Sequence, residues 1–355
     1  MAPGPFFLLK EDELGDWDRF VQRHECGTIY HLSNWKGFLE EVCPHVRGEY
    51  VALRNTNSGD IVAGIPLYIA TSSLLGTRMI STPFATLGGA LVSSAGDMAR
   101  LRAAIWEIAA RAGARRLEIR GLRRPNLTDL KPLAPSSQFL HHFLELPDSP
   151  EKLRPRFSRV VRRNIAKAVK GGVRIVEDNS TEALNKFSLM HQSERKRLGL
   201  PAFPAHFFQA LQKHLPPPRL SVLVAVQQTE VLGMFLVLEH RDWSIAEYIV
   251  VTESGREQGA GHLLYWESMV RSIEAGRKFY SLGRTAPDRS GLLQFKRSWG
   301  GIEETLMTLT YPTPHSSLMF LSSNPLAGQL ARFFFRNVPA ALSRTMSSFF
   351  YSHWA

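Results

Sequence analysis

Residues 50–70 read YVALRNTNSGDIVAGIPLYIA, a pattern typical of a strand, a polar turn containing glycine and a second strand. Residues 220–240, LSVLVAVQQTEVLGMFLVLEH, have the same pattern. Residues 101–121 (LRAAIWEIAARAGARRLEIRG) predict a helix, a glycine stop and a buried strand, and residues 263–283 (LLYWESMVRSIEAGRKFYSLG) repeat that order. Single hairpins and helix–strand units are common. Two of them recurring in the same order, at offsets of 160 to 169 residues, indicate an internal duplication.

Each copy therefore contains a hairpin, a helix and a further strand, which predicts an α/β fold with a mixed twisted sheet flanked by helices. We place one domain at 1–150 and a second at 151–312, joined within the proline-rich stretch 125–150. Residues 313–355 alternate apolar and basic residues and predict an amphipathic helical tail. We favour docking of this tail on the core, although its aromatic and arginine residues would also suit a helix at a membrane interface.

Composition limits the class of protein. The 355 residues are 44% hydrophobic and 21% charged, as in soluble globular proteins, and the formal net charge is +11. This surplus favours a polyanionic partner: nucleic acid, a pyrophosphate-bearing ligand or an anionic membrane surface. Cys26 and Cys43 belong to no metal-binding or disulfide pattern, and we find no secretory signal and no apolar stretch long enough to cross a bilayer. We expect a cytoplasmic protein without a metal, with peripheral contact with the inner membrane face as a further option.

A glycine-containing turn precedes the helix predicted over 262–273. Glycines between a strand and a helix allow close approach of a ligand, and the free N–H groups of a helix N-terminus attract anions. The spacing Arg-x-x-Gly-x-Gly resembles the pyrophosphate loop of GNAT acetyltransferases, although glycine is also common before helices. The resemblance implies these donor-binding candidates: Arg256, Gln258, Gly259, Ala260 and Gly261.

A second motif follows the strand that ends at Gly283-Arg284. Cations at the end of a sheet strand are well placed to meet a ligand in the crevice there. We therefore expect Arg284 and Lys296 to bind an anionic substrate, with Trp299 on the same helical turn as Lys296. The alternative is a buried aromatic pair with solvated charges.

A basic helix is predicted near the start of the second domain. Residues 154–170 contain seven basic residues and no acidic one, and five basic residues share one face of a helix: Arg156, Arg159, Arg163, Lys167 and Lys170. Such a stripe is usually a solvated face. Without compensating acids it also suits phosphates, on tRNA, a nucleotide-linked precursor or a lipid pyrophosphate.

Several of these motifs together resemble FemAB-like proteins, which include peptidoglycan bridge-forming aminoacyltransferases and relatives associated with polysaccharide export or protein sorting. The matching segments span about 80–300: the Pro83-Phe84 loop with Gly88-Gly89, the basic helix 162–173, the helix 259–267, and Gly283-Arg284 followed by Phe295-Lys296-x-x-Trp299-Gly300. The resemblance implies tandem GNAT-like domains and a role in substrate binding for Phe84, His191 and Arg195. The first domain is then a degenerate copy, because Ser93–Met98 lacks the glycine-loop spacing. One departure is Ser281, at a position where relatives often carry an acidic residue.

The resemblance implies transfer of an aminoacyl or acyl group to an amine of a cell-envelope precursor, by direct attack within a ternary complex. The donor would be aminoacyl-tRNA or acyl-CoA as a co-substrate, with no permanently bound cofactor. We find no G-x-S-x-G nucleophile, and the general base is unassigned: Tyr248, Glu247 and Asp288 are candidates by location only. Two alternatives stay open, an acetyl-CoA-dependent N-acetyltransferase of an amino sugar or amine, and a non-catalytic protein that binds RNA or a lipid-linked glycan.

Overall fold

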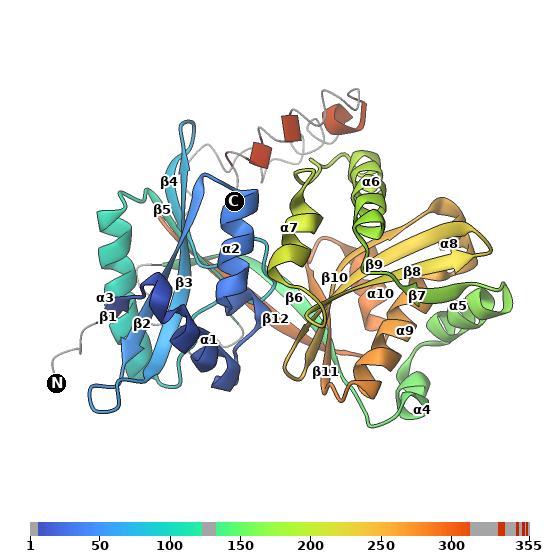
Figure 1. Ribbon diagram of the computed structural model, residues 1–355, viewed down its shortest axis with the longest axis horizontal. Coiled ribbons are helices and arrows are strands. Elements are labelled where there is room, and N and C mark those ends of the chain that lie inside the picture. The colour runs from blue at the N-terminus through green and yellow to red at the C-terminus, as the bar shows by residue number, and fades with distance from the viewer. Residues whose placement is uncertain are drawn as a thin grey trace. The chain divides into compact units, whose positions relative to one another are not determined.

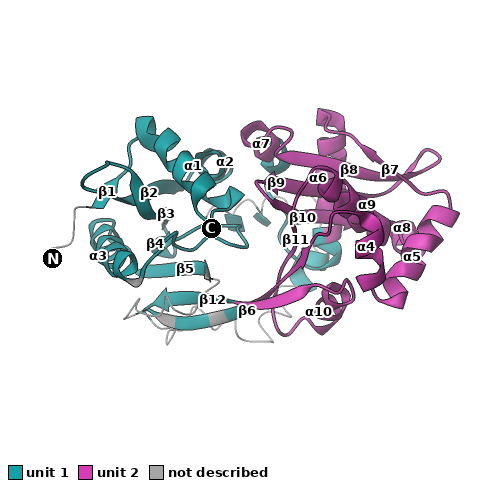
Figure 2. Cartoon of the chain, turned by 90° about the horizontal axis from the view of Figure 1, so that it is seen from below, with its two compact units in different colours: residues 1–138, 195–210, 306–355 teal, residues 139–194, 211–305 magenta. Residues whose placement is uncertain are grey.

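The chain folds into two compact units, shown in different colours in Figure 2. The computed structural model describes residues 6–122, 133–312, 333–337, 346–347, 350–351 and 353. Unit 1 contains residues 1–138, 195–210 and 306–355, and unit 2 contains residues 139–194 and 211–305. Both units are therefore discontinuous along the chain, whereas the sequence boundaries at 150 and 312 treat each domain as one continuous segment.

Unit 1 is a mixed sheet with helices (Figure 1). The strand order is β1-β2-β3-β4-β5-β12; β4 and β5 are parallel, and all the other neighbouring pairs in this order are antiparallel. Its elements are β1 (Phe6–Leu8), α1 (Leu14–Arg23), α2 (Ser33–Val42), β2 (Val46–Arg54), β3 (Ile61–Ser72), β4 (Gly76–Ile80), α3 (Ala95–Arg111), β5 (Arg116–Leu122) and the end of β12 (Ile302–Tyr311). The apolar face of α3 packs on the sheet, where Leu101 and Ile105 join Ile65 and Ile119 in one buried cluster.

Unit 2 repeats this arrangement with the strand order β6-β11-β10-β9-β8-β7. Its elements are most of β6 (Ala134–Glu145), α4 (Pro150–Leu153), α5 (Arg159–Lys170), β7 (Arg174–Glu177), most of α6 (Thr181–Arg197), the end of α7 (Phe207–His214), β8 (Leu220–Gln227), β9 (Glu230–His240), β10 (Trp243–Val251), α8 (Glu253–Gln258), α9 (Ala260–Glu274), β11 (Phe279–Thr285) and α10 (Ser290–Arg297). Ser158 caps the N-terminus of helix α5, because its hydroxyl accepts from the Val161 amide. Val161 and Ile165 of α5 pack with residues of α9 in the buried core of unit 2.

The predicted duplication is present in the pairing of strands. In unit 1, β2, β3 and β4 are antiparallel, α3 follows, and β5 pairs parallel with β4. In unit 2, β8, β9 and β10 are antiparallel, α9 follows, and β11 pairs parallel with β10. The α/β fold class predicted from the sequence is confirmed.

The next strand of each copy pairs outside that copy. Strand β6 follows the first copy in the chain but pairs antiparallel with β11 in unit 2. Strand β12 follows the second copy and pairs antiparallel with β5 in unit 1. This exchange of strands is the main reason why the units are discontinuous.

The predicted C-terminal tail lies largely outside the described residues. Its described part includes a helical segment at 333–337. Within unit 1, the Ser347 hydroxyl accepts from the Ala202 amide and the His353 carbonyl accepts from Arg78. Among the described residues, no helix combines the length and apolar character that crossing a membrane requires.

Candidate functional site

The parallel strands β10 and β11 of unit 2 pair over only three residues, from Trp243 opposite Phe279 to Ile245 opposite Ser281. Beyond this point both strands are irregular. Strand β10 carries an extra residue, Glu247, relative to β9. Strand β11 shifts relative to β6 between Ser281 and Arg284. Bulges re-aim side chains and end strand pairing, so the two strands separate here, and both carry polar residues beyond this point, among them Glu247 and Arg284.

Lys296, on α10, lies at this separation. Its side chain is almost fully buried, and Nζ donates to the carbonyl oxygens of Gly283 at 2.9 Å and Arg284 at 3.2 Å. Gly283 has a φ of +73°, so the backbone turns there in a way that favours glycine. Burial lowers the pKa of the Lys296 amine to about 7, and the negative charge of Glu247 only partly offsets this effect. The amine therefore changes charge near neutral pH.

Three other predicted residues lie on nearby strands and helices of unit 2. Arg284 is half-buried, with its guanidinium over the ring of Phe139 at 4.6 Å. Tyr248 is half-buried on β10, next to the bulged Glu247, and its ring makes an edge contact with the imidazole of His191 at 6.3 Å. The structure thus brings His191 and Tyr248 together, although the sequence did not predict their contact.

Two predicted residues have other surroundings. Trp299 is completely buried in the core of unit 2, where it contacts the rings of Phe157 and Tyr265. It holds α10 against the core and has no exposed surface that a substrate could contact. For Trp299 the alternative of a buried aromatic residue therefore replaces the predicted role in substrate binding. Asp288 is exposed in the turn between β11 and α10.

The predicted donor loop is not an open turn. Arg256 and Gln258 lie in the short helix α8, where Arg256 donates to the Val251 carbonyl and Gln258 to the Ser254 hydroxyl. Gly259 ends this helix with a φ of +79°, and a β-carbon there would lie 2.5 Å from the Asn164 carbonyl oxygen of α5. Ala260 is fully buried, and Gly261 is half-buried in the first turn of α9. The close packing of α5 on the start of α9 thus explains the glycine at position 259, whereas a β-carbon on Gly261 would meet only the Val251 side chain of β10.

The basic face of α5 is exposed. Arg159, Arg163 and Lys167 face solvent, as do the apolar side chains of Val160 and Val169. The opposite face is buried through Val161, Ile165 and Ala168. The helix therefore presents a cationic surface that its own core contacts leave uncovered.

Phe84 and Arg195 belong to unit 1. Phe84 has a φ of +59°, rare for a residue with a side chain, and packs edge-on against Phe203 and Phe207. Arg195 lies over the Phe203 ring at 5.3 Å and donates to the Pro201 carbonyl at 2.8 Å. Both residues thus stabilise an aromatic cluster of unit 1.

The unit 1 counterpart of the strand separation is filled by the chain itself. A β-carbon on Gly121, in β5, would lie 2.7 Å from the Thr86 carbonyl oxygen, and one on Gly88 would lie 2.5 Å from the Thr82 side chain. The segment that corresponds to the glycine loop starts α3, where the Ser94 hydroxyl accepts from the Asp97 amide. The degeneracy of the first copy stays a prediction from the sequence.

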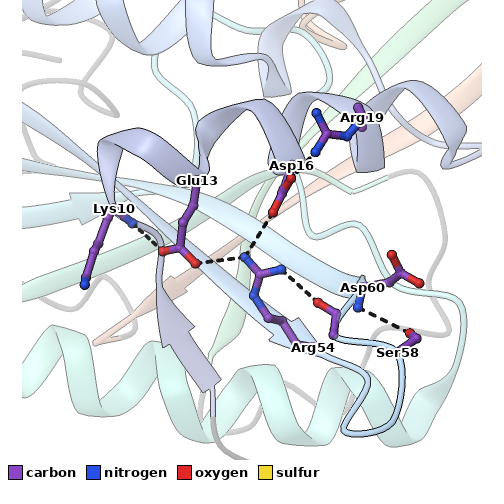
Figure 3. Close-up of polar contacts among 8 residues, drawn as sticks. Lys10, Glu13, Asp16, Arg19, Arg54, Ser58 and Asp60 are labelled. Carbon is purple, nitrogen blue, oxygen red and sulfur yellow. Dashed lines mark hydrogen bonds and ion pairs between the residues drawn. The ribbon is translucent and has the colours of Figure 1, made fainter.

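Unit 1 also has a polar cavity of about 330 Å³ beside α1 (Figure 3). Arg54 lines it and donates to Glu13 Oε1 and the Gly59 carbonyl, with Asp16 at 3.6 Å. Arg19 is ion-paired with Asp16. Because these guanidinium groups are bound to neighbouring acceptors, the cluster mainly fixes the β2–β3 turn to α1.

His141 and Glu304 of unit 2 belong to no motif in the sequence. His141, on β6, is fully buried, with Nδ1 2.7 Å from Glu304 Oε1 and Nε2 2.8 Å from the Ser281 hydroxyl. The Gly283 amide also donates to this hydroxyl at 3.1 Å. His141 is separated from Ser281 by 140 residues and from Glu304 by 163, so only the folded sheet brings the three together.

Comparisons with known proteins give one matching domain and several similar folds. A family model described as an acetyltransferase (GNAT) domain matches residues 155–297. The structure is similar to FemX (TM-score 0.69, 14% identity, 86% of this chain and 97% of that chain covered). It is also similar to the C-terminal domain of a putative lysylphosphatidylglycerol synthetase from Agrobacterium fabrum (TM-score 0.58, 13% identity, 89% and 96% covered) and to a tandem GNAT protein from the clavulanic acid biosynthesis pathway (TM-score 0.54, 15% identity, 88% and 99% covered). No curated protein matches the chain by sequence.

The match identifies residues 155–297 as a GNAT-type acyltransferase domain, and the fold of the whole chain is similar to that of a tandem GNAT protein. Among such proteins, the fold of the whole chain is similar to that of FemX, which confirms the FemAB-like resemblance at the level of the fold.

Proposed function

We propose that the chain transfers an aminoacyl group to an amine of a cell-envelope precursor, by direct attack within a ternary complex at the separation of β10 and β11. The observation that carries this proposal is the position of Lys296. In its charged form the amine has three N–H donors, and the carbonyls of Gly283 and Arg284 accept two of them. We assign the third to the oxyanion that forms on the donor carbonyl, because a fixed donor in a site without water is worth most there.

The packing of Gly259 supports a donor other than acyl-CoA. A pyrophosphate needs access to the first amides of α9, but the Asn164 carbonyl approaches Gly259 closely and Ala260 is buried. Helix α5, which carries Asn164, also offers the exposed cations Arg163 and Lys167 to a polyanion. Charged tRNA satisfies both conditions, because its phosphates can contact α5 while only its acylated end reaches the strands.

The acceptor class is inferred from proteins with similar folds. FemX and the putative lysylphosphatidylglycerol synthetase domain have similar folds, and the name of the second protein includes a lipid product. We extend this to a peptidoglycan or exopolysaccharide precursor that carries an amine and an anionic group, with Arg284 as the contact for the anion. The reaction would take place in the cytoplasm, where charged tRNA is made, with peripheral contact with the inner membrane face if the precursor is lipid-linked.

The match to the acetyltransferase family model favours one second candidate, acetyl-CoA-dependent acetylation of an amino sugar or amine. In this case the start of α9 would have to open by movement of α5.

In the test, the full chain is incubated separately with two pairs of substrates. The first is tRNA charged with radiolabelled amino acids plus a UDP-linked muramyl pentapeptide with a lysine amine, and the second is acetyl-CoA plus glucosamine. We expect label in the pentapeptide only, and a loss of about 10²–10³-fold for Lys296→Met, typical of a missing oxyanion donor. Lys278→Met is the matched control, because Lys278 is exposed and paired with Asp242. Product from acetyl-CoA alone would establish the second candidate, and no product from either pair would overturn both.

A further inference from the structure

Ser281, His141 and Glu304 form a continuous hydrogen-bonded chain in unit 2, from the separation of β10 and β11 to the surface. Ser281 is the last residue of β11 that pairs with β10, and it is almost fully buried. Glu304, on β12, has 23% of its side chain exposed. His141 lies between them without any exposed surface.

The hydrogen-bond roles follow from the chemistry of the groups. A carboxylate only accepts, so the Nδ1–H of His141 donates to Glu304. Nε2 of the neutral ring then accepts from the Ser281 hydroxyl. The Gly283 amide holds the same hydroxyl oxygen in place. The serine hydroxyl is thus set to pass its proton to the imidazole, and the carboxylate stabilises the imidazolium that results.

Gly283 connects this chain to Lys296. Its amide binds the Ser281 hydroxyl, and its carbonyl accepts from Lys296 Nζ. A substrate beside Lys296 would therefore also be close to Ser281. A structural role alone, bridging three strands, is the competing explanation for such a buried polar chain.

We propose that Ser281, His141 and Glu304 form a proton shuttle for the acyl transfer. This rests on the proposed function and adds the missing general base. As the amine, in its neutral form, attacks the donor carbonyl, Ser281 takes one proton from the nitrogen and gives its own to Nε2 of His141. As the carbon–oxygen bond of the leaving group breaks, the proton returns by the same path to the leaving oxygen. One C–N bond forms and one C–O bond breaks, no net proton is released, and His141 regains its first tautomer. Ser281 is the catalytic residue, and His141 and Glu304 are positioning residues that act through it.

Strands β6 and β12, which carry His141 and Glu304, also provide a matched control. His142, next to His141, also has a glutamate partner, Glu303, at 2.9 Å from Nε2. Glu303 is bound by Arg297, and no serine continues this pair among the described residues. His142→Gln therefore removes a buried histidine–glutamate pair of the same kind but leaves the shuttle intact.

The test measures pH profiles of kcat and KM for the full chain, with whichever substrate pair the wild-type protein uses. We expect His141→Gln and Ser281→Ala to lower kcat about 10²-fold, as for loss of a general base, with KM unchanged and the acid limb of the profile lost. The double variant should be no worse than either single one. Ser281→Thr, which keeps the hydroxyl, should retain much of the activity, and Glu304→Gln should lower kcat by about tenfold. His142→Gln should stay within twofold of the wild type.

Three results would overturn the shuttle: an unchanged kcat and acid limb in His141→Gln, an equal loss in His142→Gln, or a Ser281→Thr variant as poor as Ser281→Ala. Unfolding temperatures of all variants separate loss of catalysis from loss of fold, and the partly exposed Glu304 gives a variant that should fold in any case. A wild-type protein without transfer activity would contradict the proposed function instead.

Discussion

Replacing Lys296 by methionine should make the protein more stable at low pH, and the gain should shrink as the pH rises. Burial lowers the pKa of this amine from an ordinary value of 10.5 to about 7. Between these values the folded state binds fewer protons than the unfolded state, so the free energy of unfolding rises with pH across this window. Below pH 7 the amine is charged in both states, and its burial then lowers the free energy of unfolding by about 5 kcal/mol, at about 1.4 kcal/mol for each unit between the two pKa values. The two lost hydrogen bonds offset about 2 kcal/mol of the gain.

Urea unfolding of wild type and Lys296→Met at pH 6 and pH 9.5 measures this effect, because groups common to both proteins cancel in the difference. The gain from the substitution should fall by about 3 kcal/mol between the two pH values, with the two pKa values inserted in the linkage relation. Lys278→Met, at a position with a side chain 68% exposed, should show no comparable change. A Lys296→Met effect that is the same at both pH values would refute the reasoning, because the amine would then have an ordinary pKa in the folded protein.

Three further predictions concern other parts of the chain. Gly259→Ala should destabilise the protein by about 2–4 kcal/mol in urea unfolding, because the left-handed backbone is strained for alanine and the new carbon would meet the Asn164 carbonyl; a neutral effect would show that α5 yields easily. The double change of Arg163 and Lys167 to glutamine should weaken tRNA binding and reduce the slope of log K against log salt by between about 1 and 2, measured by fluorescence anisotropy; an unchanged slope would place the phosphates elsewhere. Burial lowers the pKa of His31 to about 4, so the folded state resists protonation and should lose about 3 kcal/mol as the pH falls from 6.5 to 4; comparison with His31→Gln in acid unfolding checks this, and parallel curves would contradict it.

The fold could be predicted from local patterns, and the strand exchange could not. Hairpins and amphipathic helices have a period that is visible in a short stretch, and the repeat of their order revealed the duplication. The strands 134–145 and 302–311 have equally clear patterns, but nothing in their side chains specifies which distant edge each one joins. Pairing between distant segments depends on the whole sheet, so the domain boundaries differ from the units.

The site shows the same limit. Arg284 and Lys296 were recognisable because their motif is contiguous, but the burial that lowers the pKa of Lys296 depends on the fold. The glycine pattern around Gly259 was ambiguous, because a glycine required by a neighbouring helix and one required by a phosphate look identical in sequence. His141 had no signal at all, since its partners are 140 and 163 residues away.

The exchange of β6 and β12 also has a consequence for synthesis on the ribosome. Unit 1 begins at the N-terminus, but the edge of its β5 is covered only when residues 306–311 have been made. Unit 2 receives β6 early and can complete its pairing with β11 before the chain is finished. The unit that is translated first is therefore expected to complete its fold last, with the edge of β5 open to incorrect partners in the meantime. A nascent chain truncated before residue 306 should accordingly need chaperone protection that the complete chain does not.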